Sequence, residues 1–229
     1  MKKTISLIFA ALFLFSCLSA QYYKIITVDA GTKVIEMFPN SVRYLYPQFT
    51  DGQVFMKTGV SNTTKLNYNL LLGEIEFLQD HDTLVLSKKK DINLITVAQD
   101  TFIYRNGYLK LIHSGTVKVC LKDKIKLKDV VKKGAMGTSN RTSSVDSYDA
   151  VPLDGRLYSI VSADDLEFQR TVEYYILTSS GDLIEFRKKN VMELYPQKEA
   201  EIQKYLKSNK VSFDKQEDIL RFADFLSGF

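Results

Sequence analysis

The sequence has no tryptophan and only two cysteines, two histidines and four prolines among its 229 residues. Cys17 lies in an N-terminal leader that we expect to be removed, so Cys120 is the one thiol of the mature chain. A single thiol excludes an internal disulfide, even in an oxidising compartment. Stability must therefore come from packing, for which 13 tyrosines and 14 phenylalanines supply large apolar side chains.

Sequence motifs for metal, nucleophile and cofactor chemistry are also missing. His81, His113 and Cys120 do not occur in CxxC or HExxH spacing, so no metal site is predicted. The chain has no G-x-S-x-G nucleophile elbow, no Gly-rich phosphate loop and no dinucleotide fingerprint. We therefore expect no cofactor and assign no catalytic residues.

The first 20 residues have the layout of a secretory signal peptide. Lys2 and Lys3 precede an apolar run from Ile5 to Leu14, which is shorter than the ~20 residues that a spanning helix needs. Small residues then stand just before Gln21, where we expect cleavage. The alternative is a lipobox ending at Cys17, in which case the lipidated cysteine would tether the protein to a membrane.

The charge balance argues against a nucleic-acid partner. The chain has 31 basic and 27 acidic residues, and removal of Lys2 and Lys3 with the leader leaves a net charge of +2. Nucleic-acid-binding domains carry a clear basic excess. We expect an exported protein, periplasmic or extracellular, with no nucleic-acid partner and no transmembrane span after cleavage.

Most of the mature sequence has the composition and alternation of β-strands. Tyr22–Val28 is rich in β-branched and aromatic residues, and residues 74–77 alternate acidic with apolar side chains. Asn106-Gly107 separates two strand-like segments and predicts a tight hairpin, because both central positions of such a turn favour positive φ. The sequence predicts a mainly β fold of antiparallel hairpins in a sandwich- or barrel-like sheet.

The C-terminal end changes to a helical period and predicts a pair of α-helices. Pro196 suits the start of a helix over 198–207, and Asp214 with Glu217 resembles a capping box before a second helix. The predicted organisation is a signal peptide at 1–20, a β-rich domain at 21–131 and a flexible loop or linker at 132–150. Strands that complete the sheet and the helices follow at 151–229.

One strand-like segment, residues 116–128, alternates apolar side chains with lysines. A regular strand would place Cys120 on the lysine face, where neighbouring cations would lower its pKa and make it a candidate reactive thiol. Asp123 interrupts the apolar row, so a bulge or turn is expected at Asp123-Lys124. Strand lysines either bind anions or prevent edge-to-edge sheet pairing. The candidate anion-binding residues are Lys118, Lys122, Lys124, Lys126 and Lys128.

Glu74 and Glu76 would share one strand face, roughly 6–7 Å apart from the strand rise. Paired carboxylates at such a distance do acid/base work in glycosidases, so a carboxylate-dependent hydrolase of the periplasm or cell surface is one candidate function. A solvated strand face has the same pattern far more often, and we expect that interpretation here.

Three segments resemble a group of uncharacterised secreted or periplasmic proteins from Bacteroidota. They are KLNYNLLLGEIEFL at 65–78, KKGAMGTS at 132–139, and the ending from Leu194 to Leu226. The resemblance spans most of the mature chain and supplies no catalytic residues. Asp82-Thr83-Leu84 also resembles the short O-glycosylation acceptor of that phylum, which makes Thr83 a candidate modification site.

These features favour a non-enzymatic exported binding protein or envelope-associated protein, with the hydrolase as the alternative. Its partner would be an anionic glycan, a lipid headgroup or another envelope protein.

Overall fold

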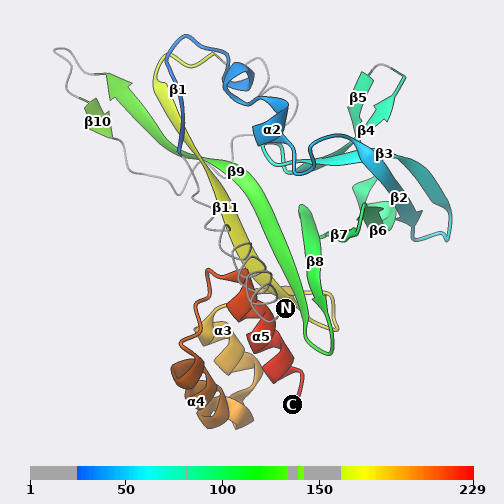
Figure 1. Cartoon of the computed structure of the whole chain (residues 1–229), viewed down its shortest axis with the longest axis vertical. Coiled ribbons are helices and arrows are strands. Elements are labelled where there is room, and N and C mark those ends of the chain that lie inside the picture. Colours follow the sequence, from blue (N-terminus) through cyan, green and yellow to red (C-terminus); the bar gives the residue numbers. More distant parts are fainter. Residues whose placement is uncertain (1–24, 81, 134–138, 142–160) are drawn as a thin grey trace, which may run out of the picture.

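The computed structural model describes residues 25–80, 82–133, 139–141 and 161–229. Within these residues, twelve strands form one antiparallel sheet. The strands are β1 Ile26–Val28, β2 Thr50–Met56, β3 Ser61–Asn69, β4 Glu74–Gln79, β5 Asp82–Val85, β6 Ile92–Val97, β7 Asp100–Tyr104, β8 Tyr108–Ser114, β9 Lys118–Lys133, β10 Ser139–Arg141, β11 Asp165–Leu177 and β12 Leu183–Glu185. Their order is β1-β11-β9-β8-β7-β6-β2-β3-β4-β5, with β10 beside β9 and β12 beside β11, so the sheet is open (Figure 1).

Helices follow the last strand, so the predicted mainly β fold with C-terminal helices is confirmed. The α-helices are α2 Asn40–Arg43, α3 Lys188–Leu194, α4 Glu199–Asn209 and α5 Gln216–Leu226. The 3-10 helices are η1 Val34–Met37, η2 Lys89–Asp91 and η5 Pro196–Lys198. None of the helices in the described ranges has both the length and the apolar character needed to cross a membrane.

The start of α5 differs from the predicted capping box. The helix begins at Gln216, and its cap residue Lys215 makes no side-chain cap hydrogen bond. Instead, Asp218 within the first turn accepts a hydrogen bond from the backbone N–H of Ser212, at 3.0 Å. Asp218 is the third residue of the helix and reaches back to an upstream N–H, which is the role predicted for Glu217, and its carboxylate also interacts favourably with the helix dipole.

β9 and β11 form a long antiparallel ribbon through the middle of the molecule (Figure 1). β9 passes through Asp123-Lys124 in register, with Asp123 opposite Val172, so the bulge or turn predicted there is wrong. The register shifts instead between Glu167 and Phe168. β9 also extends to Lys133 and pairs there with β10, so two parts of the expected loop are strands, whereas 134–138 and 142–150 lie outside the described residues.

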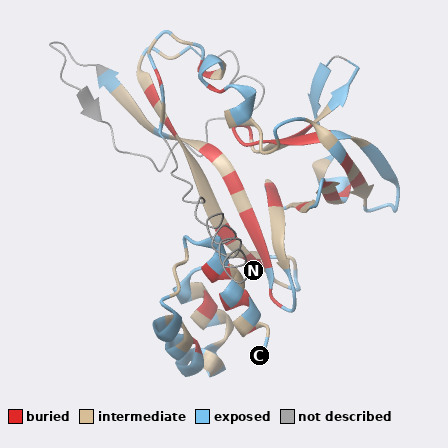
Figure 2. Ribbon diagram, viewed as in Figure 1, coloured by how far each residue is buried: buried red, intermediate tan, exposed pale blue. Residues whose placement is uncertain are grey.

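Two hydrophobic clusters share this ribbon. The first gathers buried residues from β1 through β8 together with Ile125, Leu166 and Phe168. The second joins Val119 of β9 and Ile176 of β11 to the C-terminal helices. Figure 2 shows buried positions alternating along β9 with less buried ones, as a strand covered mainly on one face requires. β9 and β11 contribute residues to both clusters, so neither cluster corresponds to one continuous segment of the chain.

Candidate functional site

A pocket of about 230 Å³ lies where the β3–β4 turn, the β7–β8 turn and part of β9 meet. Its polar side chains come from all three segments. They are Tyr68, Glu74, Tyr104, Asn106, Tyr108, Lys122 and Lys124. This pocket joins parts of the chain that are far apart in the sequence.

Two turns position these side chains. In the β3–β4 turn, the side-chain oxygen of Asn69 accepts hydrogen bonds from the N–H groups of Leu71 and Leu72, at 3.1 and 3.0 Å. Gly73 then adopts a φ of 68°, which glycine reaches without strain, and carries the chain to Glu74 at the start of β4. The hydrogen-bonded turn therefore fixes where the carboxylate enters the pocket.

The β7–β8 turn confirms the predicted tight hairpin, with φ of 51° at Asn106 and 127° at Gly107. Because this turn is so short, Tyr104 and Tyr108 face each other as the last pair of the two strands. Their ring centroids are 5.1 Å apart in an edge-to-face arrangement. The ammonium group of Lys89 lies 5.9 Å from the centre of the Tyr104 ring.

Glu74 is partly buried and only half paired. Its Oε1 accepts a hydrogen bond from Lys89 Nζ at 2.5 Å, which forms an ion pair. Its Oε2 is buried and has no hydrogen-bond partner among the described residues. A buried carboxylate oxygen without a partner is costly, so this atom is ready to accept a hydrogen bond from a ligand or from water.

Tyr108 also has a polar atom without a hydrogen-bond partner among the described residues, and it is more deeply buried than Glu74. The residue is 2% exposed, and its hydroxyl has no hydrogen-bond partner within the part of the chain that the structure describes. Burial raises the pKa of this phenol, and the charge of Glu74 and the neighbouring Tyr104 raise it further. The hydroxyl therefore stays protonated and can both donate and accept a hydrogen bond.

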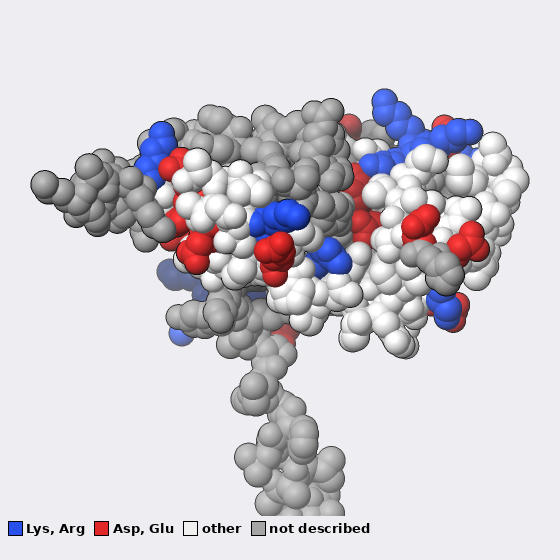
Figure 3. Space-filling model, turned by 90° about the horizontal axis from the view of Figure 1, so that it is seen from above, with Lys and Arg blue, Asp and Glu red and all other residues white. Residues whose placement is uncertain are grey.

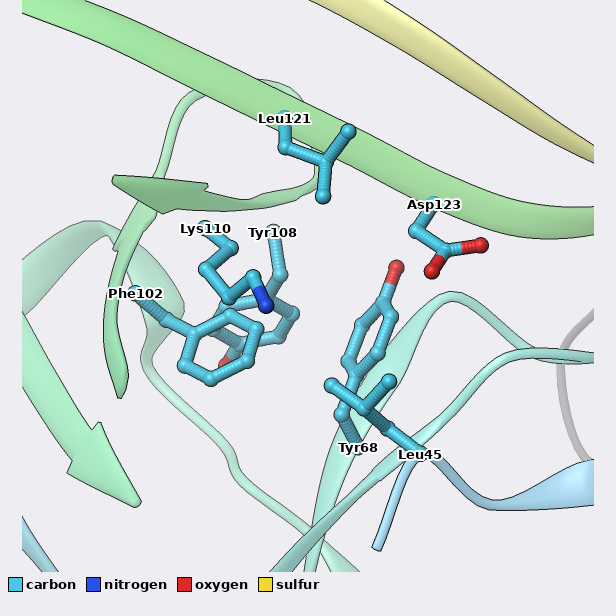
Figure 4. A pocket seen from close by; sticks show the side chains of 7 residues that line it. All are labelled: Leu45, Tyr68, Phe102, Tyr108, Lys110, Leu121 and Asp123. Carbon is cyan, nitrogen blue, oxygen red and sulfur yellow. The ribbon is translucent and has the colours of Figure 1, made fainter. Parts of the chain in front are cut away.

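A second, much smaller cavity adjoins the same tyrosines (Figure 4). At about 10 Å³ it has room for one water molecule at most. Figure 4 shows the Tyr68 hydroxyl pointing toward the carboxylate of Asp123. Burial, and then the charge of Asp123, raise the pKa of Tyr68. Tyr68 thus faces a carboxylate of the protein itself, whereas the hydroxyl of Tyr108 lacks such a partner among the described residues.

The structure does not gather the five candidate lysines into one surface. Lys122 and Lys124 border the pocket, whereas Lys118 and Lys128 are exposed toward the ends of the strand. Lys126 donates a hydrogen bond to Glu173 at 2.5 Å. Burial alone would raise the pKa of Glu173, but hydrogen bonds from Lys126 and Tyr175 outweigh it and hold the pKa below its usual value.

Acidic and basic side chains lie next to one another on the face of the molecule shown in Figure 3. This mixture agrees with the small net charge of the sequence. Anion binding by all five lysines together stays a prediction, and the geometry favours Lys122 and Lys124.

Cys120 does share a strand face with the lysines, but it is completely buried. Burial raises the pKa of its thiol to about 11, and the nearby charges of Arg105 and Lys118 only partly oppose this effect. The direction is opposite to the one expected from the lysine pattern, because the cost of burying a thiolate exceeds the attraction of the two cations.

We therefore expect Cys120 to react slowly with a thiol reagent in the folded protein. A rise in pKa from 9.0 to about 11 reduces the thiolate fraction about a hundredfold, and burial blocks access as well. Labelling with iodoacetamide, followed by mass spectrometry, should be at least about a hundredfold slower in buffer than in denaturant. Comparable rates in the two conditions would show that the native thiol is reactive.

Glu76 does not join Glu74 in the pocket. It is 3% exposed, and it accepts hydrogen bonds from Tyr44 Oη at 2.7 Å and from Asn69 Nδ2 at 3.0 Å. The expectation of a solvated acidic face is therefore wrong for Glu76, since the segment around α2 supplies Tyr44 to cover it. The hydrogen bond from Asn69 links β3 to β4. Among the described residues that line the pocket, Glu74 is the one acid.

The remaining candidates are placed as follows. Thr83 is exposed on β5, opposite Leu78, and its glycosylation stays a prediction. Cys17 and His81 lie outside the described residues. His113 bridges β8 and α5, with Nδ1 2.6 Å from the carbonyl oxygen of Val117 and Nε2 2.9 Å from Asp224 Oδ1. In the described ranges, no three His, Cys, Asp or Glu side chains come together as a metal site would require.

Comparisons with known proteins add no assignment. No protein-family model matches the chain, and neither the curated proteins nor the solved structures include a significant match. Any function must therefore be argued from the pocket.

Proposed function

We propose that this chain is an exported, non-enzymatic binding protein whose ligand occupies the pocket between the β3–β4 and β7–β8 turns. One observation carries the proposal. Two buried polar atoms at the pocket, Glu74 Oε2 and the Tyr108 hydroxyl, have no hydrogen-bond partner among the described residues. Such groups cost about 1–3 kcal/mol each when unsatisfied, so a ligand that supplies both partners gains that free energy. The signal-peptide pattern of residues 1–20 supports export.

The arrangement of acids favours binding over hydrolysis. A glycosidase needs two carboxyl groups on either side of the bond that it cleaves. Among the described residues that line this pocket, Glu74 is the one acid, and it already pairs with Lys89. Glu76, the second acid of the suspected pair, is occupied by Tyr44 and Asn69.

Replacing Tyr108 with phenylalanine is expected to stabilise the free protein by about 1 kcal/mol, because it removes a buried hydroxyl that lacks a partner. Urea unfolding measures this change. The matched control is Tyr46→Phe, since the Tyr46 hydroxyl donates a hydrogen bond to Asp100 Oδ2 at 2.7 Å. The control should lose about 1 kcal/mol.

The same variant tests binding. A panel of small hydroxylated compounds is screened by thermal shift on the wild-type protein, and each compound that raises Tm is repeated on Tyr108→Phe. A ligand at 100 times its Kd stabilises the folded state by about 2.7 kcal/mol, a rise of about 5–10 °C for a chain of this size. The gain should be largely lost in Tyr108→Phe and kept in Tyr46→Phe. If Tyr108→Phe destabilises the protein as the control does, and no compound raises Tm, the proposed function is wrong.

A further inference from the structure

The inner part of the pocket specifies the groups that a ligand must present. Glu74 Oε2 belongs to a carboxylate that pairs with Lys89, and a carboxylate oxygen accepts hydrogen bonds, so we expect the ligand to donate to it. The protonated hydroxyl of Tyr108 donates as well as accepts. Adjacent hydroxyl groups satisfy both atoms, because a hydroxyl can fill either role.

The charges around the pocket favour an anion over a cation. Lys89 already pairs with Glu74, so the carboxylate brings little net negative charge to the site. Lys122 adds a positive charge at the border, where its stem passes 3.8 Å from the position that a Cβ at Gly107 would take. The nearest acid on β11 in register with Lys122 is Glu173, and it pairs with Lys126. A negative group on the ligand would therefore be attracted to this border.

The size and walls of the pocket limit the ligand to about one ring. A volume of about 230 Å³ lies below the usual range of about 300–1,000 Å³ for drug-sized ligands. Leu71, Leu72 and the ring of Tyr104 supply apolar wall between the inner polar atoms and the lysines. A sugar ring combines these requirements, since its C–H faces are apolar and its edges carry hydroxyls.

We infer that the pocket binds a single acidic sugar unit, with its hydroxyls on Glu74 and Tyr108 and its anionic group at Lys122. This inference rests on the proposed function and names the class of ligand. The acid group sits at the open, lysine-bearing border, so the unit can be a free sugar acid or the end of an acidic glycan.

The test is isothermal titration of the full mature protein with four probes at low salt. Glucuronate carries both hydroxyls and an anionic group, glucose lacks the charge, glucosamine carries the opposite charge, and acetate is an anion without hydroxyls. We expect glucuronate to bind about tenfold or more tightly than glucose, and acetate and glucosamine to bind weakest.

The variants separate the two parts of the site. Lys122→Ala should weaken glucuronate binding about fivefold to tenfold and leave glucose unchanged, whereas Glu74→Gln should weaken both sugars. The control is Lys128→Ala, which removes an exposed lysine of the same strand away from the pocket and should change neither.

Other results of these titrations would contradict the acidic-sugar assignment, the proposed function, or both. Equal affinity for glucose and glucuronate, preference for glucosamine, or an effect of Lys128→Ala equal to that of Lys122→Ala would overturn the acidic-sugar assignment. In those cases the proposed function stands if the Tm rise caused by the bound sugar is lost in Tyr108→Phe and kept in Tyr46→Phe. If none of the four probes binds while another compound of the thermal-shift panel does, the assignment alone is wrong. If nothing binds at all, the proposed function is wrong as well.

Discussion

Replacing Arg170 with methionine is expected to lower the free energy of unfolding by about 3–5 kcal/mol. Arg170 binds Asp123 through two hydrogen bonds, from Nε to Oδ1 at 2.8 Å and from Nη2 to Oδ2 at 2.6 Å. The Asp123 side chain is 11% exposed, so removal of the guanidinium leaves a buried charge without its main partner. Equilibrium unfolding in urea measures the loss.

The same substitution at Arg187 is the control. Arg187 pairs with Glu185 at 2.5 Å, but its side chain is 70% exposed, so Arg187→Met should cost no more than about 1 kcal/mol. Replacing both members of the buried pair, as Asp123→Leu with Arg170→Met, should recover most of the loss, because no uncompensated charge remains. Equal effects of Arg170→Met and Arg187→Met would show that the buried pair adds nothing to stability.

Asp123 also shows where sequence reasoning reached its limit. A charged residue in an apolar row predicted a break in the strand, and the prediction failed because the compensating residue is 47 positions away. No local pattern links Asp123 to Arg170, and their pairing depends on the register of β9 with β11. Short sequence patterns predicted the structure correctly where the preference belongs to the residues themselves. Asn106-Gly107 forms the hairpin that it predicted, because the preference of these residues for positive φ is their own.

Only some of the residues at the candidate site could be predicted from the sequence. Glu74 was noted as one of two acids on a strand face, but its pairing with Lys89 and the covering of Glu76 by Tyr44 are tertiary contacts. Tyr108 was missed because the turn signal alone does not place it. A two-residue turn at Asn106-Gly107 would set Arg105 opposite Tyr108, whereas the observed three-residue connection sets Tyr104 opposite Tyr108. No local sequence pattern predicted that β9 would place lysines beside these tyrosines.

The five candidate lysines of β9 also show what a sequence pattern alone does not predict. Their alternation correctly placed them on a strand, but a one-dimensional pattern treats all five as equivalent. The partner strand makes them different, since it supplies Glu173 for Lys126, while the short β8 leaves Lys122 and Lys124 beside the pocket. Charge patterns therefore predict a face, and the neighbouring strands decide what each lysine contacts.

Replacing Phe222 with alanine is expected to cost about 3–5 kcal/mol and to loosen the second hydrophobic cluster specifically. Phe222 is 0% exposed and lies at the centre of an aromatic group, with ring centroids 5.6 Å from Phe186 and 5.6 Å from Tyr205. Few compensating shifts are open to rings stacked on two sides, so most of the cavity should persist. Urea unfolding measures the total loss, and the control is Phe229→Ala, a 41% exposed ring that should cost less than about 1 kcal/mol.

Amide hydrogen exchange then shows where the loss falls. Val119 and Ile176 belong to the cluster of Phe222, whereas Ile125 and Phe168 on the same two strands belong to the first cluster. In Phe222→Ala, exchange should therefore accelerate in α3–α5 and at the helix-facing ends of β9 and β11, and stay slow around Ile125. Equal acceleration along the whole ribbon would show that the two clusters unfold as one unit. In that case the pocket, which borders β9 at Lys122 and Lys124, would owe its stability to the C-terminal helices as well as to the hairpins that form it.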